Sequence, residues 1–147
     1  MHVGIAGTGK MGTAIGQNLL DRGYRVSAWN IDRAMMDALV ASGAKPFDDL
    51  GSLVGSVDAM IVMLWDDEVA RQISLGRIIP AARERQLVIE STTLSPQMYE
   101  ALAEAAAQRG VEFLACPVIG SVDGARAGTL TLFREAAPRS SSMPVNS

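Results

Sequence analysis

The stretch that decides the fold is Val3-Gly4-Ile5-Ala6-Gly7-Thr8-Gly9-Lys10-Met11-Gly12. Its first four residues form a short apolar run that predicts a buried strand, and the glycines that follow have the spacing Gly-x-Gly-x-x-Gly. Residues 10–22 carry an apolar stripe at helical spacing, so the turn joins a strand to a helix. Such a turn brings backbone N–H groups and the positive end of a helix dipole to one point, which favours the binding of a diphosphate.

Strand-like and helix-like segments alternate along the rest of the chain. After residue 22 the pattern predicts strands at 25–29, 58–64, 87–89, 111–115 and 129–133, and helices at 32–41, 48–54, 66–73, 77–85 and 97–109. This alternation is typical of a doubly wound, mostly parallel sheet, the Rossmann-type α/β fold. We therefore expect one domain over residues 1–133. Residues 134–147 are rich in Ser and Pro, lack an apolar period, and are expected to form a disordered tail.

Composition narrows the classes of function. The chain has 147 residues, a net charge of −3 and one cysteine, and no apolar stretch approaches the roughly 20 residues of a membrane helix. We expect a cytoplasmic protein that binds neither nucleic acid nor a membrane. Asp66, Asp67 and Glu68 predict the first turn of a helix rather than a metal site. His2 and Cys116 are interpreted as structural residues, since the single histidine begins the first strand, at the wrong end for catalysis.

The end of the second predicted strand bears on the choice between NAD and NADP. NAD-specific domains usually place Asp or Glu there, to bind the ribose hydroxyls. This chain has Asn30, which is neutral and would not repel a 2′-phosphate, and Arg33 follows within reach of that phosphate. Asp32 favours NAD instead, if the strand ends later. The sequence favours NADP and leaves NAD open.

Several stretches resemble the β-hydroxyacid dehydrogenase family, which includes 3-hydroxyisobutyrate dehydrogenase, glyoxylate reductase, the NAD(P)-binding domain of 6-phosphogluconate dehydrogenase and, as relatives, imine reductases. The glycine turn is extended as residues 7–20 and 23–30, and Asp58-Ala-Met-Ile-Val-Met-Leu64 is similar to the family's fourth strand. Glu90-Ser-Thr-Thr-Leu-Ser-Pro96 is similar to its Asp-x-Ser-Thr-x-x-Pro segment, and residues 113–133 are similar to its substrate-binding segment. The resemblance covers residues 1 to about 133, the N-terminal domain of the family only.

The resemblance implies roles for individual residues. Gly120 and Ser121 would hold a substrate carboxylate. Ile31, Trp65 and Ile119 depart from the family, which often has Arg, Pro and Ser at these places. The cofactor-binding residues implied are Gly7, Thr8, Gly9, Lys10, Met11 and Gly12 in the turn, Asn30, Ile31, Asp32 and Arg33 after the second strand, Met63, Leu64 and Trp65 after the fourth, and Thr92 near the nicotinamide ribose.

The resemblance ends before the part of the family that carries catalysis. Members continue with a long helix that bears a catalytic lysine and then with a helical domain, whereas Lys10 and Lys45 are the lysines here and neither matches that lysine. We therefore expect no catalytic residue in this chain, and a truncation or a change of reading frame at Arg134. Exposed apolar surface would then favour self-association into a homo-oligomer.

Three functions follow from these observations. The first is the cofactor domain of an oxidoreductase that moves a hydride between a nicotinamide and a small hydroxy acid or its aldehyde, or an imine, with little activity when alone. The second is a dinucleotide-binding module without catalysis. The third is a half-enzyme that a separate helical chain completes.

Overall fold

The opening strand β1 (His2–Ala6) lies in the middle of the sheet, and the chain winds outward from it to both sides. The computed structural model describes residues 1–119, 122–128, 131–132 and 135–136. The strand order is β3-β2-β1-β4-β5-β6-β9, and each pair is parallel except β6 with β9. The predicted doubly wound, mostly parallel fold is confirmed. The other strands are β2 (Arg25–Trp29), β3 (Lys45–Pro46), β4 (Ala59–Val62), β5 (Leu87–Glu90), β6 (Glu112–Ala115) and β9 (Glu135–Ala136).

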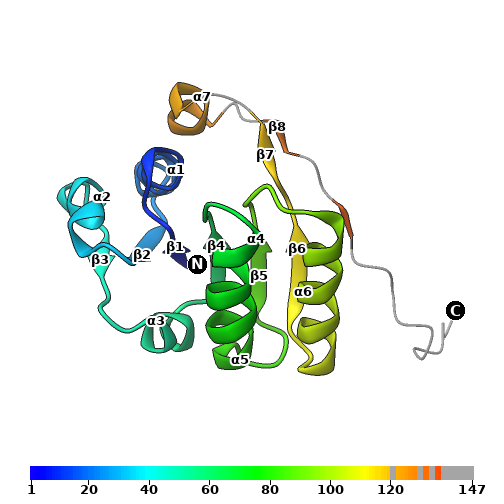
Figure 1. Cartoon of the computed structure of the whole chain (residues 1–147). Helices are drawn as coiled ribbons and strands as arrows, with labels where there is room; N and C mark the ends of the chain where they lie inside the picture. Colours follow the sequence, from blue (N-terminus) through cyan, green and yellow to red (C-terminus); the bar gives the residue numbers. More distant parts are fainter. Residues whose placement is uncertain (120–121, 129–130, 133–134, 137–147) are drawn as a thin grey trace, which may run out of the picture.

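Helices cover both faces of the sheet, as Figure 1 shows. One face carries α1 (Lys10–Asp21), the short 3₁₀ turn η1 (Arg33–Met36) and α2 (Asp37–Ala41). The helix α7 (Val122–Ala127) packs on α1, and β7 (Val118–Ile119) pairs with β8 (Thr131–Leu132) in a separate two-stranded ladder. The other face carries α3 (Leu50–Ser56), the continuous helical segment α4–η2–α5 (Asp67–Ala70, Arg71–Ile78 and Ile79–Ala81) and α6 (Pro96–Gln108).

Two hydrophobic cores follow from the alternation of side chains along the central strands. Ile5 of β1 packs with Val26 and Ala28 of β2 under η1 and α2. Their neighbours along the strands point the other way and join a larger core under α3, η2 and α6. Ile61, Ile89 and Leu114 lie on the first face and are only half-buried. Self-association through exposed apolar surface stays a prediction.

The helical segment after β4 differs from the sequence-based prediction. Two helices were expected, at 66–73 and 77–85, but one continuous segment runs over residues 67–81 and contains a π-helix at Arg71–Ile78. Pro80 has no N–H to donate to residue 76 and its ring crowds that carbonyl, so widened turns accommodate it. Residues 83–85 form a turn instead, in which Arg85 adopts a φ of 67° and donates its N–H to the Gly110 carbonyl at 2.6 Å.

Smaller differences concern short elements. The predicted helix at 32–41 begins with a 3₁₀ turn, because the Asp32 carboxylate accepts from the Ala34 N–H at 3.1 Å and tightens the first turn. The two-residue strands β3 and β7 and the helix α7 were not predicted. Residues 131–132 of the predicted last strand form β8. Within the expected tail, Glu135–Ala136 pairs with β6 and residues 137–147 lie outside the described part, so the domain division at 133 stays a prediction.

Among the described residues, every helix falls short of the length and apolar character needed to cross a bilayer.

Candidate cofactor-binding site

The glycine turn between β1 and α1 is held by backbone contacts that leave no room for a side chain at two of its glycines, Gly7 and Gly12. Gly7 has a φ of +100° and donates its N–H to the Trp29 carbonyl at 2.9 Å. A Cβ on Gly7 would lie 1.9 Å from the Met63 carbonyl oxygen, and one on Gly12 would lie 2.0 Å from the Gly7 carbonyl oxygen. Both glycines are therefore required by the packing of the turn against the neighbouring strand and helix.

Gly9 has a different environment. A Cβ placed on it would meet nothing within 4 Å, and the residue lines a cavity of about 540 Å³. It is also the N-cap of α1, where within the described structure no side chain caps the helix and no acidic residue occupies the first turn. The first N–H groups of α1 are thus free donors at the positive end of a 12-residue helix, beside an open space.

Asn30 ties the turn to the end of β2. Its Oδ1 accepts from the Thr8 N–H at 2.9 Å, and its Nδ2 donates to the Asp32 carbonyl at 2.9 Å. Thr8 is buried, and its hydroxyl donates to the Met35 carbonyl at 2.9 Å. Asn30 lines the cavity, but its amide already forms hydrogen bonds within the protein, and the Thr8 side chain is bonded to the Met35 carbonyl rather than directed to the cavity.

The outer rim of the cavity combines apolar and charged side chains. Ile31 and Trp65 line it and are 66% and 84% exposed, so they offer uncovered apolar surface to a ligand. Asp32 also lines the cavity, whereas Arg33 is not among the lining residues and forms an exposed ion pair with Asp48. The structure therefore brings Asp32, and not Arg33, to the wall of this cavity.

The remaining wall comes from the end of β4, backed by the end of β5. Met63 donates its N–H to the Ala6 carbonyl at 2.9 Å, and Leu64 donates its N–H to the Thr92 hydroxyl at 2.8 Å. Thr92 is buried beneath Leu64 and does not line the cavity. Its carbonyl accepts from the Tyr99 hydroxyl at 2.6 Å, so Thr92 positions this wall.

A buried carboxyl lies behind Thr92. Glu90 is fully buried at the end of β5; its Oε2 accepts from the Ser74 hydroxyl at 2.6 Å, and its Oε1 accepts a long bond, 3.4 Å, from the Thr92 N–H. Burial raises the pKa of Glu90 from 4.5 to about 7, although the hydrogen bonds from Ser74 and Thr92 act in the opposite direction. Sequence reasoning quoted Glu90 only as part of a motif. A carboxyl that ends an otherwise apolar strand was the available signal.

The other candidate residues are placed as follows. Asp66 caps α4 by accepting from the Val69 N–H at 3.0 Å, with Asp67 and Glu68 in the first turn, so the helix-start interpretation is confirmed. Cys116 is buried. Within the described part of the chain, no three His, Cys, Asp or Glu side chains gather into a metal site. Gly120 and Ser121 lie outside the described residues.

Comparison with known proteins agrees with this geometry. The sequence of residues 2–141 matches the protein family described as the NAD-binding domain of 6-phosphogluconate dehydrogenase. The 3-hydroxyisobutyrate dehydrogenase of Pseudomonas aeruginosa is 32% identical over 131 residues, which are 88% of this chain and 44% of that protein. The chain spans about half the length of the curated relatives it matches.

Solved structures of other proteins also superpose on this chain. The Mycobacterium tuberculosis 3-hydroxyisobutyrate dehydrogenase with L-serine superposes with a TM-score of 0.86 at 29% identity, over 90% of this chain and 45% of that one. Psf3 in complex with NADP⁺ and 2-OPP superposes with a TM-score of 0.88 at 29% identity, over 92% of this chain and 49% of that one.

Proposed function

Because the chain belongs to the family of the NAD-binding domain of 6-phosphogluconate dehydrogenase, we propose that its glycine turn and the start of α1 hold the diphosphate of a nicotinamide dinucleotide. The rest of the cavity then takes the adenosine ribose beside Asn30 and Asp32 and the nicotinamide end beside Met63 and Leu64. Ile31 and Trp65 cover the ligand from the rim. When bound, the nicotinamide supplies or accepts the hydride, and Met63 and Leu64 orient the nicotinamide ring.

One observation carries the proposal: Gly9 has open space where a side chain would be, next to uncapped helix N–H groups. Gly7 and Gly12 are explained by packing inside the protein, but Gly9 is not. A glycine that no internal contact requires, facing a cavity with free donors, fits a ligand that approaches the backbone closely. A helix N-terminus binds anions, and the anionic group of a nicotinamide dinucleotide is its diphosphate.

A binding experiment tests the proposal. Trp29 and Trp65 both line the cavity and are the two tryptophans of the chain, so their fluorescence reports on it. We expect saturable quenching by NADPH or NADH in the wild type, and a loss of affinity of about 100-fold or more in Gly9→Val, whose side chain occupies the diphosphate position.

The control is Gly55→Val. Gly55 also has nothing within 4 Å of an added Cβ but lies on α3, away from the cavity. Its affinity is expected to stay within about twofold of the wild type, and both variants are expected to keep the wild-type circular dichroism spectrum. Equal binding by Gly9→Val and the wild type would exclude the proposed position of the diphosphate.

The reaction we propose for the complete protein is hydride transfer between the nicotinamide and a small hydroxy acid or its aldehyde, with imines as the alternative substrate class. We propose that the 147-residue polypeptide by itself binds the cofactor with little turnover. Hydride transfer requires a second wall that holds the substrate and excludes water, and the resemblance implies a lysine there. NADPH oxidation with glyoxylate, succinic semialdehyde and a cyclic imine tests this. Turnover near that of a full-length relative would contradict it.

A further inference from the structure

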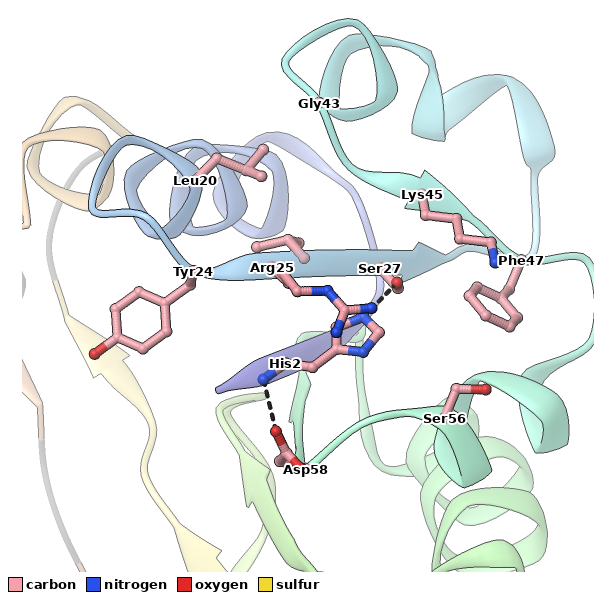
Figure 2. A pocket seen from close by; sticks show the side chains of 11 residues that line it. His2, Leu20, Tyr24, Arg25, Ser27, Gly43, Lys45, Phe47, Ser56 and Asp58 are labelled. Atoms are coloured by element: carbon pink, nitrogen blue, oxygen red, sulfur yellow. Dashed lines mark hydrogen bonds between the residues drawn. The ribbon is translucent and has the colours of Figure 1, made fainter.

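A second cavity lies at the opposite edge of the sheet, at the amino ends of β1, β2 and β3 (Figure 2). Its volume is about 510 Å³, and it shares no lining residue with the cofactor cavity. Figure 2 shows His2 and Arg25 side by side at the starts of paired strands, with Lys45 at the start of the next strand along. The sheet therefore brings three nitrogen-bearing side chains from separate parts of the chain to one concave surface.

Polar groups that line this cavity are held by hydrogen bonds. The His2 Nε2 lies 2.7 Å from the hydroxyl of Ser27, which is buried. The carboxylate of Asp58, the single acidic residue of the lining, accepts from the backbone N–H of His2 at 2.7 Å. This hydrogen bond lowers the pKa of Asp58 below its ordinary value. The one negative charge in the cavity is therefore already hydrogen-bonded to the protein backbone.

The cations of the cavity differ from Asp58 in their partners. Among the described residues, Arg33 and Arg71 pair with carboxylates, whereas neither Arg25 nor Lys45 does. Lys45 lies over the ring of Phe47, with its Nζ 5.2 Å from the centroid. The pKa of His2 is lowered, chiefly by burial and then by the charge of Arg25, with a smaller effect from Lys45, although a hydrogen bond with Ser56 and the charge of Asp58 act in the opposite direction. The lining therefore carries two cationic side chains, Arg25 and Lys45, against the one carboxylate of Asp58, although the chain as a whole has a net charge of −3.

We propose that this cavity is a binding site for a phosphate group, separate from the cofactor site. The Arg25 guanidinium offers a planar pair of donors, Lys45 offers an ammonium, and both extend from exposed positions at the rim. Ser27 adds a hydroxyl to the lining. When Ser27 donates its proton to the bound anion, its oxygen accepts from the protonated His2 Nε2, so the anion and the imidazolium stabilise each other.

His2 makes the site directly observable, because it is the single histidine of the chain. We would titrate inorganic phosphate into the 147-residue protein, without a histidine tag, and follow the imidazole signals by NMR at constant pH and ionic strength. The expected result is a saturable shift of the His2 signals and a higher pKa of His2 in phosphate than in chloride. Arg25→Gln is expected to weaken phosphate binding by about tenfold, and Lys45→Gln also weakens it.

The matched control is Arg71→Gln, which removes the same charge from an exposed position in η2 outside both cavities. Its phosphate affinity should stay within about twofold of the wild type. A linear, non-saturating shift of the His2 signals would overturn the proposal. Equal weakening by Arg25→Gln and Arg71→Gln would also overturn it, because net charge alone would then explain the effect.

Discussion

The two ends of β1 and β2 open into cavities of similar size, about 540 and 510 Å³, that are built from different parts of the chain. At the carboxyl ends the donors are backbone N–H groups, arranged by Gly7, Gly9 and Gly12 at the start of α1. At the amino ends the donors are the side chains of Arg25 and Lys45. One end offers an anion fixed dipoles, and the other offers mobile charges.

This difference determines at which cavity a residue can be replaced without loss of folding stability. Backbone donors require a specific local path of the chain, so a substitution that disturbs the path disturbs folding and binding together. Side-chain donors on exposed positions are separable from folding, and replacing them affects binding alone. Stability measurements therefore distinguish the two ends before any ligand is added.

The largest expected effect is that of Gly12→Ala. The added Cβ would lie 2.0 Å from the Gly7 carbonyl oxygen, and because that atom belongs to the backbone, the turn must move. We expect the free energy of unfolding to fall by about 3 kcal/mol, measured by urea denaturation.

Two other variants are expected to lose less stability than Gly12→Ala. Gly9→Ala adds the same methyl group to open space and is expected to cost less than about 1 kcal/mol. Arg25→Gln, at the other end of the sheet, should change stability by less than about 0.5 kcal/mol. A similar loss in Gly9→Ala and Gly12→Ala would show that packing does not distinguish the two glycines.

The next effect concerns Glu90, whose buried side chain lies behind Thr92 and the cofactor cavity. Its pKa is raised from 4.5 to about 7, so the folded protein holds a proton that the unfolded chain releases between these values. The stabilisation is complete below pH 4.5 and is lost as the pH rises through about 7, by about 3 kcal/mol in the free energy of unfolding. Glu90→Gln cannot ionise and should lack this part of the pH dependence.

Comparing variants isolates Glu90 from the other titrating groups. His2, whose pKa is lowered, makes stability rise with pH in the same window, but it contributes equally to the wild type and Glu90→Gln. Ser74→Ala removes the hydroxyl that lowers the pKa of Glu90, so the loss of stability should begin at the same pH but extend to higher pH. Identical pH profiles for all three proteins would show that Glu90 does not titrate in this range.

The sequence predicted the carboxyl-end site because its geometry is local. Three glycines within six residues, a strand before them and a helix after them specify the turn without distant contacts. The same reasoning identified Asn30 but not the use of its amide by Thr8, because that contact joins residues from two strand ends. It also missed the link between Ser74 and Glu90, which depends on the π-helix before Pro80.

The cavity at the amino ends of β1, β2 and β3 could not be predicted from the sequence, for a related physical reason. His2, Arg25 and Lys45 lie about 20 residues apart, and only the pairing of β1, β2 and β3 brings them together. The two-residue strand β3 was not predicted, so Lys45 had no assigned place. A lone histidine at a strand start has no spacing that indicates a partner. Sites made of backbone are readable from short motifs, whereas sites made of side chains require the topology.

The smallest effect we expect is at Arg33, which follows the lining residue Asp32 but does not itself line the cavity at the carboxyl ends of the strands. We propose that Arg33 binds the 2′-phosphate of NADP after leaving Asp48, since their ion pair is exposed and therefore weak. Arg33→Gln should then weaken NADPH binding by roughly fivefold and leave NADH binding unchanged, while Asp48→Asn, which frees Arg33, should strengthen NADPH binding by a similar factor. Tryptophan fluorescence titrations measure both. If Arg33→Gln changes neither cofactor's affinity, the pocket beside Asp32 does not use this cation, and Asp32 would favour the unphosphorylated ribose of NAD.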